Sequence, residues 1–281
     1  MHTITRCCAL CALFSFILLP SSTNQAADYE VERPCVTHVD VELVLAADVS
    51  ASMDEIELKA QRQGHIDALL HPEILQAIHE GMFGCIAVSY IEWASQQLVV
   101  VDWYVLKDQT DVSELVEHLS HAVLEPARNE ATNIASALSF ARELLLNNKY
   151  VAPRMVIDIS GDGMNTTSEE LLGRERSGVI EAGITINGLA MMFPGEEANT
   201  LRTGQLNLPW YFEDCVIGGM GAFQVSVRTV RDFPYSIRRK LLREIAGLDA
   251  VPMLQQASVR SPVPCGPPNA NPYYGGAFYG R

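Results

Sequence analysis

Hydrophobic residues fall into two kinds of run that alternate along the chain. Short runs that are apolar almost throughout, such as residues 41–47 (VELVLAA), are typical of strands buried on both faces of a parallel sheet. Longer segments with apolar residues three or four positions apart are typical of helices that pack on a sheet. This alternation predicts an α/β fold with a doubly wound, mostly parallel sheet flanked by helices. The predicted strands cover residues 41–47, 84–94, 97–105, 154–160, 183–191 and 222–227. The predicted helices cover residues 54–78, 112–123, 133–146, 168–182 and 232–247. The Gly- and Pro-rich segment 193–224 is expected to be mainly loop up to the last strand.

Local signals add detail to this fold. The strands 84–94 and 97–105 are so close in sequence that we expect a hairpin, which gives the sheet one antiparallel edge strand. Asp54 and Glu57 fit a capping box at the start of the first helix, and Asp232 is the expected cap of the last one. The expected apolar stripe of the first helix consists of Ile56, Ala60, Ile66, Leu69 and Leu70.

The first 27 residues differ from the rest of the chain. Arg6 is followed by the apolar run CCALCALFSFILLP and then by small and polar residues, SSTNQAA. This is the layout of a secretory signal peptide, and the apolar run is shorter than the ~20 residues of a membrane span. A retained anchor is the alternative. We expect a signal peptide over residues 1–27, a lead over 28–38, one domain over 39–257 and a flexible Pro-, Gly- and Tyr-rich tail over 258–281.

Charge and cysteine usage agree with export. The net charge of −14 at pH 7 repels phosphate backbones, so nucleic-acid binding is disfavoured, whereas divalent cations are compatible with it. Cys35, Cys85, Cys215 and Cys265 remain after removal of the signal peptide. In an oxidising compartment four cysteines allow two disulfides with three possible pairings, and Cys265 would then hold the tail. The sequence therefore predicts an exported protein, periplasmic or secreted.

Small oxygen-bearing side chains follow two of the predicted strands and precede one helix. Asp48, Ser50 and Ser52 follow the first strand, Thr132 precedes the helix 133–146, and Asp162 follows the strand 154–160. Side chains at alternate positions of an extended turn face the same way, so the first three can converge on one point. Each of these residues alone is explained by a helix cap or a turn. Together they offer carboxylates and hydroxyls, the hard oxygen ligands of Mg²⁺ or Mn²⁺.

This arrangement resembles the metal-ion-dependent adhesion site of von Willebrand factor A domains. The motif Asp-x-Ser-x-Ser follows the first strand, a Thr lies in a later loop, and an Asp lies in an Asp-Gly turn at a strand end. The similarity covers about residues 39–248 in motif order and strand order. Several segments also resemble a bacterial family of exported A-like domains without an assigned function, namely VLAADVSASMD, IAVSYIEWAS, VIDISGDGMN, GITINGLAM and VIGGMGAF.

The resemblance implies a recognition module and not an enzyme. Ser50 and Ser52 would bind a divalent cation directly, with Thr132 as a further candidate, and Asp48 and Asp162 would bind directly or through water. An exchangeable coordination position would take an acidic side chain of a protein partner. The oligomeric state and the identity of the partner stay open.

Two alternatives arise from the same residues. The family turn is usually Thr-Asp-Gly, whereas this chain has Gly161-Asp162-Gly163, and Gly-Asp-Gly also occurs in haloacid-dehalogenase-type phosphatases. In a metal-dependent hydrolase of that kind Asp48 would be the nucleophile, but the acid and base expected two residues later is Ser50. The other alternative is a structural envelope protein that binds no metal.

Three further polar residues have less specific interpretations. Asp158 interrupts the apolar strand 154–160, and a buried carboxylate must be paired. It either supports the metal site from behind or forms a structural pair with an Arg or a backbone group. His118 and His121 lie three apart on a helix and are expected to be a solvated pair.

Overall fold

The structure is a computed structural model that describes residues 35–124, 127, 130–192, 207–247, 262–263 and 265. The predicted signal peptide lies outside the described residues, as do most of the predicted lead 28–38 and most of the predicted tail 258–281. The predicted boundaries of these segments therefore stay predictions.

The described strands form one sheet of six. They are β1 (Glu42–Asp48), β2 (Ile86–Trp93), β3 (Gln97–Leu106), β4 (Met155–Gly161), β5 (Ile184–Met191) and β6 (Gln224–Val227). Their order is β3-β2-β1-β4-β5-β6, and neighbouring strands are parallel except for the antiparallel pair β2 and β3. The predicted α/β fold, with a doubly wound, mostly parallel sheet and one antiparallel edge strand, is confirmed.

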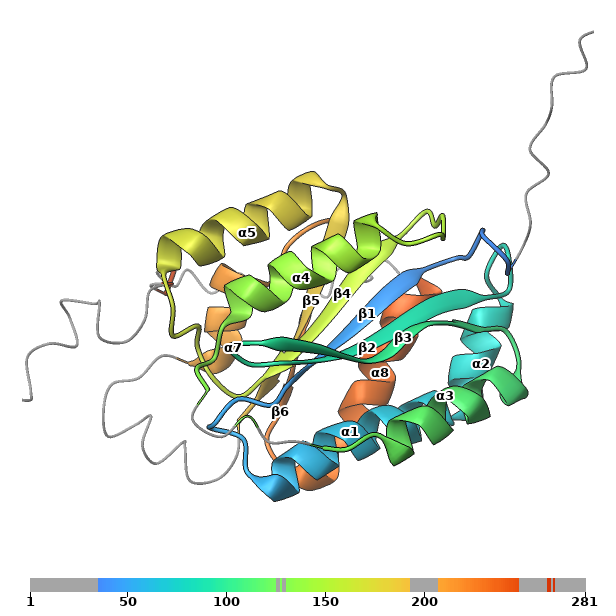
Figure 1. The fold of residues 1–281 in the computed structure, drawn as a ribbon, viewed down its shortest axis with the longest axis horizontal. Helices are drawn as coiled ribbons and strands as arrows, with labels where there is room; N and C mark the ends of the chain where they lie inside the picture. The colour runs from blue at the N-terminus through green and yellow to red at the C-terminus, as the bar shows by residue number, and fades with distance from the viewer. Residues whose placement is uncertain are drawn as a thin grey trace, which may run out of the picture. The chain divides into compact units, whose positions relative to one another are not determined.

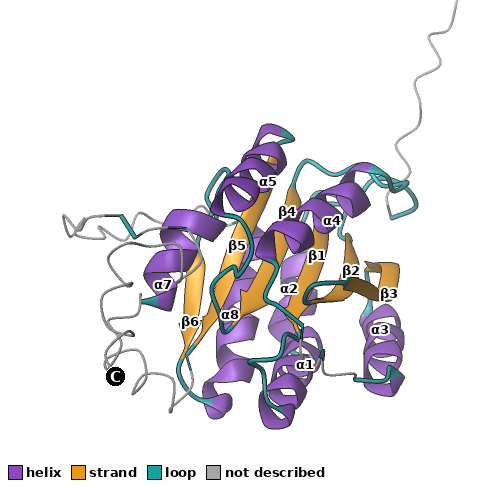
Figure 2. Ribbon diagram, turned by 60° about the vertical axis from the view of Figure 1, so that its left-hand side comes forward, coloured by secondary structure: helices purple, strands orange, loops and turns teal. Residues whose placement is uncertain are grey.

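Helices cover both faces of this sheet, as Figures 1 and 2 show. They are α1 (Glu55–Leu69), α2 (Pro72–His79), α3 (Gln109–His121), α4 (Ile134–Leu146), α5 (Glu169–Glu181), α7 (Leu208–Tyr211) and α8 (Phe233–Ala246), with a π-helical turn η1 (Phe212–Val216) and a 3₁₀ turn η2 (Val230–Asp232). α1, α2, α3 and α8 pack on one face, and α4, α5 and α7 pack on the other, each over its own apolar core. The central strand β1 is buried along its whole length. None of the described helices is both long and apolar enough to span a membrane.

The predicted helix 54–78 is two helices in the structure. It breaks at Leu70 and His71 because a residue before proline disfavours helical backbone, and Pro72 then begins α2 with His71 as its cap. The expected apolar stripe is partly wrong, since Ile56 is 67% exposed and Leu70 is 40% exposed. The buried side of α1 contains polar residues that a hydrophobic pattern cannot find, and it consists of Leu58, Gln61, Arg62, Gly64, His65, Ile66, Ala68 and Leu69.

The side-chain cap that the sequence predicts is present at the start of α1 and absent at the start of α8. The capping box of Asp54 and Glu57 is present at α1. Asp232 occupies the cap position of α8, but its carboxylate accepts a hydrogen bond from Thr229 Oγ1 and caps nothing. Within the expected loop 193–224, α7 and η1 form two helical turns. These turns were not predicted because the segment is rich in Gly and Pro.

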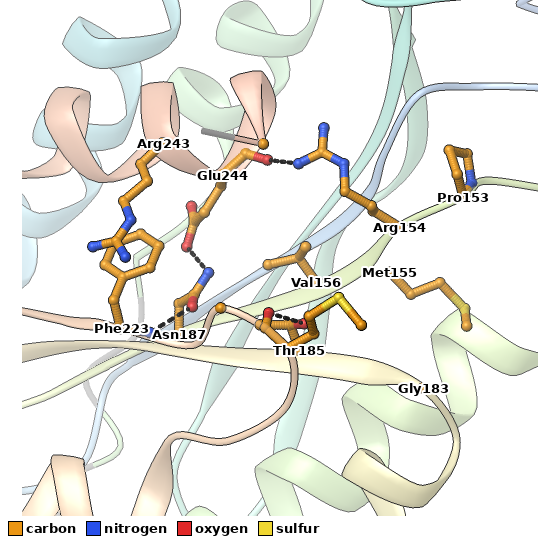
Figure 3. A pocket seen from close by; sticks show the side chains of 13 residues that line it. Pro153, Arg154, Met155, Val156, Gly183, Thr185, Asn187, Phe223, Arg243 and Glu244 are labelled. Carbon is orange, nitrogen blue, oxygen red and sulfur yellow. Dashed lines mark hydrogen bonds between the residues drawn. The ribbon is translucent and has the colours of Figure 1, made fainter. Parts of the chain in front are cut away.

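Asp158, inside β4, belongs to a buried ion network with α8. Lys240 Nζ lies 2.6 Å from Asp158 Oδ1 and 2.6 Å from Glu244 Oε1, and all three residues are at most 2% exposed. Asn187 donates to Glu244 Oε1 (2.9 Å) and accepts from the Phe223 amide (3.1 Å). Figure 3 shows these last three residues beside a pocket at the amino ends of β4 and β5. Of the two interpretations of Asp158, the structural pair is therefore the one that the structure supports. Its partner is a lysine and not the expected Arg or backbone group.

This network makes the stability of the fold depend on pH. Burial and the neighbouring Asp158 charge raise the pKa of Glu244 from its ordinary value of 4.5 to about 8. Because the folded state binds this proton more tightly than the unfolded state, the stabilisation is present at low pH and is lost between about pH 5 and pH 8. Glu244→Gln cannot titrate, so its free energy of unfolding is expected to exceed that of the wild type at pH 8, on the order of 2 kcal/mol, and to match it at pH 5.

Urea unfolding at both pH values measures this difference. The exposed Glu80→Gln is the matched control, and its pH dependence is expected to follow the wild type. A Glu244→Gln curve that runs parallel to the wild type across this range would show that another group titrates.

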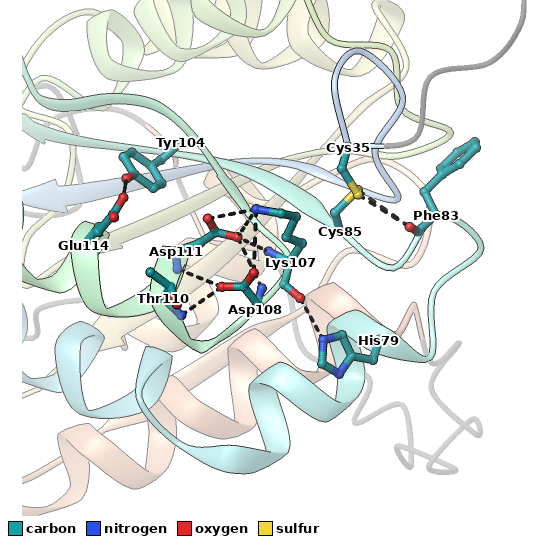
Figure 4. A network of polar contacts seen from close by, with 10 residues as sticks. All are labelled: Cys35, His79, Phe83, Cys85, Tyr104, Lys107, Asp108, Thr110, Asp111 and Glu114. Atoms are coloured by element: carbon teal, nitrogen blue, oxygen red, sulfur yellow. Dashed lines mark hydrogen bonds and ion pairs between the residues drawn. A yellow bond between two sulfur atoms is a disulfide. The ribbon is translucent and has the colours of Figure 1, made fainter.

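Two disulfides are present among the described cysteines, Cys35–Cys85 and Cys215–Cys265. Each closes a separation of 50 residues, and together they resolve the pairing that the sequence left open. Figure 4 shows the first of them close to the start of α3, where Asp108 caps the helix. The second connects Cys265 to η1, as expected of a tail held by that cysteine, and Val263 N adds a hydrogen bond to Asp214 Oδ2 (2.8 Å).

Candidate metal centre

The predicted site residues lie where the two central strands end. Asp48 is the last residue of β1, Asp162 directly follows β4, and β1 and β4 are neighbours in the middle of the sheet (Figure 1). The chain leaves β1 for α1 on one face and leaves β4 for α5 on the other. In doubly wound sheets, ligands bind where connections diverge to opposite faces in this way.

The five predicted residues form one connected polar cluster. Ser52 Oγ donates to Asp162 Oδ1 (2.7 Å), and the hydroxyls of Ser50 and Ser52 are 3.2 Å apart. Thr132 Oγ1 donates to Ser50 Oγ (3.3 Å), and Ser50 N donates to Asp48 Oδ1 (2.7 Å). Three chain segments that are far apart in the sequence therefore bring two carboxylates and three hydroxyls to one point.

The cluster is buried except at one residue. Asp48 is 0% exposed, Ser50 is 1% exposed, and Thr132 and Asp162 are each 7% exposed, whereas Ser52 is exposed. Two carboxylate oxygens, Asp48 Oδ2 and Asp162 Oδ2, are buried and make no hydrogen bond to any described residue. Burying a carboxylate oxygen without a partner is unfavourable. A small divalent cation fits this set, because it takes hard oxygen ligands and needs no proton donor.

The pKa shifts of the two carboxyl groups agree with the fit of a divalent cation. Burial, followed by the negative charge of Asp162, raises the pKa of Asp48 to about 8, and the hydroxyl and amide of Ser50 act against this shift. Burial also raises the pKa of Asp162, while the Ser52 hydroxyl opposes it. The protein thus holds two carboxyl groups together at a position where their negative charges are not compensated by a positive side chain among their described hydrogen bonds.

The glycine that replaces the usual threonine has a steric reason. A Cβ atom at Gly161 would lie 3.0 Å from Asp48 Oδ2 and 3.4 Å from the Trp93 ring. The Trp93 indole is fully buried and donates from Nε1 to Ala46 O (3.1 Å), so it cannot easily move. The absence of a side chain at position 161 therefore lets the Asp48 carboxylate lie against the turn that carries Asp162.

Thr132 has a different local role from the one its sequence position suggests. Asn133, not Thr132, caps α4, because Asn133 Oδ1 accepts from Ser136 N (3.1 Å). The Thr132 hydroxyl is thereby free to face Ser50. Its carbonyl accepts from both the amide and the hydroxyl of Thr166 (2.9 and 3.0 Å), which ties this loop to the loop that follows Asp162.

Sequence reasoning missed several residues that surround the site. Gln61 and Ser160 form hydrogen bonds at the ends of β1 and β4. The Tyr211 hydroxyl accepts from Asn165 N (3.1 Å), three residues after Asp162, and burial raises the pKa of Tyr211 to about 12. Their side chains bond backbone groups or other neutral side chains, which leaves no motif in the sequence. The signal that remains for Gln61 is its position between buried residues of α1.

The other polar candidates do not assemble a second site among the described residues. No group of three or more His, Cys, Asp and Glu side chains is placed to hold a metal ion in that part of the chain. His118 packs edge-on against Tyr104, and His121 Nδ1 lies 2.9 Å from Glu117 O. The candidate centre differs from such clusters because three of its five side chains are hydroxyl side chains.

Solved structures that resemble this chain have the von Willebrand factor A fold, and this defines its structural class. One is a von Willebrand factor type A protein from Catenulispora acidiphila, with a TM-score of 0.50, 13% identity, and a match that covers 74% of this chain and 43% of that one. Another is the vWF domain of the type V pili tip protein Mfa5 from Porphyromonas gingivalis, with a TM-score of 0.51, 11% identity, and coverage of 74% and 96%. A third is proximal thread matrix protein 1 from the mussel byssus with a zinc occupied MIDAS motif, with a TM-score of 0.51, 8% identity, and coverage of 75% and 49%.

At these identities the likeness shows the fold alone. The match spans less than half of the Catenulispora and mussel chains. The sequence itself gives a closer assignment: residues 38–249 match the family described as "Protein of unknown function (DUF1194)", and the chain belongs to this family. A search of curated proteins found no match.

Proposed function

We propose that this domain is an exported recognition module that binds a divalent cation and uses it to engage an acidic group of a protein partner. The observation that carries the proposal is the pair of buried carboxylate oxygens, Asp48 Oδ2 and Asp162 Oδ2, which lack a hydrogen-bond partner among the described residues beside three hydroxyls. A cation compensates both charges at once, and its own positive charge attracts a carboxylate from outside.

Each residue has a distinct part in this proposal. Ser50, Ser52 and Thr132 would supply hydroxyl oxygens to Mg²⁺ or Mn²⁺, and Asp48 and Asp162 would supply charge, directly or through water. Ser52 is the exposed member, so the coordination position open to a partner would lie on its side of the cluster. The bound ion would act as a positive centre. A carboxylate of the partner would replace a water molecule on the ion.

The solved structures that resemble this chain support a recognition function, but they do not specify the partner. The mussel protein carries zinc in a MIDAS motif, and Mfa5 is a pili tip protein. The two disulfides fit an oxidising compartment, which supports export to the periplasm or out of the cell. We include in the proposal a signal peptide over residues 1–27, a recognition domain over 39–257 and a tail over 258–281.

The hydrolase alternative is weaker on two counts. Asp48 is 0% exposed, and its Oδ1 accepts the Ser50 amide, so the carboxylate is not presented to a substrate. Ser50 stands where such phosphatases need a second acid, and its hydroxyl is bonded to Thr132. General acid–base help contributes typically 10²- to 10⁴-fold to a rate, and a neutral hydroxyl does not replace it.

The proposal is tested by calorimetric titration of Mg²⁺ and Mn²⁺ into the purified protein, with and without acetate as a stand-in for the partner's carboxylate. We expect saturable binding with one ion per chain, and roughly tenfold weaker binding by Ser52→Ala because one hydroxyl is lost. Ser113→Ala, an exposed serine on α3, is the matched control and should bind as the wild type does. Absence of saturable binding by the wild type under both conditions contradicts the proposal.

A further inference from the structure

Gln61 joins the ends of the two strands that carry the candidate carboxylates. The residue is 1% exposed, and its Nε2 donates to Asp48 O (2.9 Å). Its Oε1 accepts from Ser160 Oγ (2.7 Å), and the same hydroxyl lies 3.2 Å from Ala46 O. One side-chain amide from α1 therefore bonds both β1 and β4.

These bonds lie where the strand pairing stops. The β1–β4 register ends with Ala47 opposite Ser160, so Asp48 and Asp162 are beyond the last pair. Past that point the β1–β4 backbone ladder no longer fixes the distance between these two strands. The Gln61 amide takes the place of the missing ladder bonds at this level of the sheet.

Gln61 itself is held firmly. α1 begins directly after the Ser50–Ser52 turn with a complete capping box, and Leu58, one turn before Gln61, is 1% exposed in the core. One turn after it, α1 approaches α8 so closely that a Cβ at Gly64 would lie 2.7 Å from Ile237 Cδ1. The helix cannot slide along the sheet without breaking these contacts, so the amide has a fixed position.

We propose that Gln61 is a positioning residue for the candidate metal centre, holding the ends of β1 and β4 at the separation that lets Asp48 and Asp162 share one cation. This inference rests on the proposed function. In this role Gln61 does not contact the ion. The role differs from that of an ordinary buried amide, whose loss would lower stability without a specific effect on metal binding.

The test compares Gln61→Met with a control that loses the same kind of interaction elsewhere. Gln61→Met keeps the volume of the side chain and removes both hydrogen bonds. Asn187→Leu also removes a buried amide with two hydrogen bonds, one to Glu244 of α8 and one from the Phe223 amide just before β6, away from the ends of β1 and β4. Mn²⁺ affinity is measured by calorimetry, the environment of bound Mn²⁺ by electron paramagnetic resonance, and metal-free stability by urea unfolding.

We expect Gln61→Met to weaken Mn²⁺ binding by about 10- to 100-fold and to broaden the resonance of the bound ion, since the ligands then occupy a range of separations. Asn187→Leu should lower the urea midpoint to a similar extent and leave the affinity within about twofold of the wild type. Wild-type affinity in Gln61→Met overturns the inference while the proposed function stands. An equal loss in both variants also overturns it, because general loosening then explains the effect. A wild type that does not bind Mn²⁺ overturns the proposed function and this inference together.

Discussion

Asp48→Ala is expected to lose Mn²⁺ and Mg²⁺ binding, by more than about 100-fold, while the metal-free protein stays folded. The substitution removes one of the two carboxylates and with it half of the negative charge of the cluster. Removing an outer ligand partner already weakens metal binding by about 10- to 100-fold, so the loss of a carboxylate at the ion should exceed this.

The stability of this variant gives a second readout. Without metal, the variant loses the hydrogen bond from Ser50 N to Asp48 Oδ1 but is also relieved of a carboxyl group whose charge is disfavoured by burial and then by Asp162. These effects oppose each other, so the free energy of unfolding should change by less than about 1 kcal/mol. With Mn²⁺ at about 100 times its dissociation constant, the wild type should gain about 2.7 kcal/mol and Asp48→Ala should gain nothing. Asp102→Ala serves as control, because Asp102 is an exposed aspartate of β3 whose carboxylate accepts a hydrogen bond from the Trp103 amide. If Asp48→Ala keeps the metal-induced stabilisation, the ion binds elsewhere.

Lys240→Met is expected to lower the free energy of unfolding strongly. Lys240 is 1% exposed and lies between Asp158 and Glu244, 2.6 Å from an oxygen of each. Methionine fills a similar volume but leaves two buried carboxyl groups without their cation. Breaking a buried ion pair by removing one partner costs about 3–5 kcal/mol, and we expect a loss in that range at pH 8.

Urea unfolding at pH 8 and pH 5 checks this expectation. The loss should be smaller at pH 5, because Glu244 is then protonated in the folded state and needs no cation. Lys59→Met is the control, since Lys59 and Glu55 form an ion pair with both side chains 66% exposed, and pairs of that kind contribute less than about 1 kcal/mol. Equal losses in the two lysine variants would mean that the buried network contributes no more than a surface pair.

The parts of the fold that follow from apolar runs were predictable from the sequence. Continuous apolar segments located the inner strands β1, β2, β4 and β5, because a strand buried on both faces leaves almost no polar position, as the fully buried β1 shows. The hairpin of β2 and β3 followed from their short connection. The helices were harder, since α1 buries Gln61, Arg62 and His65, and the hydrogen bonds of Gln61 and Arg62 are made to partners remote in sequence.

The candidate site was predictable to the extent that strand ends meet at one edge. That rule placed Asp48 and Asp162 together, and the structure adds the hydroxyl contacts among the three other residues. Two features lay beyond sequence reasoning. The choice of Asn133 over Thr132 as helix cap depends on backbone angles, and the disulfide pairing depends on which loops meet in space.

The location of the cluster between β1 and β4 has a consequence for folding. Ser52 and Asp162, which share a hydrogen bond, are separated by 110 residues, so the cluster is complete only after the two halves of the sheet have joined. Contacts of such long range form late because closing a large loop costs conformational entropy. A cation bound there would favour the finished domain over every partly folded form, and it would act by slowing unfolding rather than by speeding folding. Metal occupancy would then report that the chain has completed its fold.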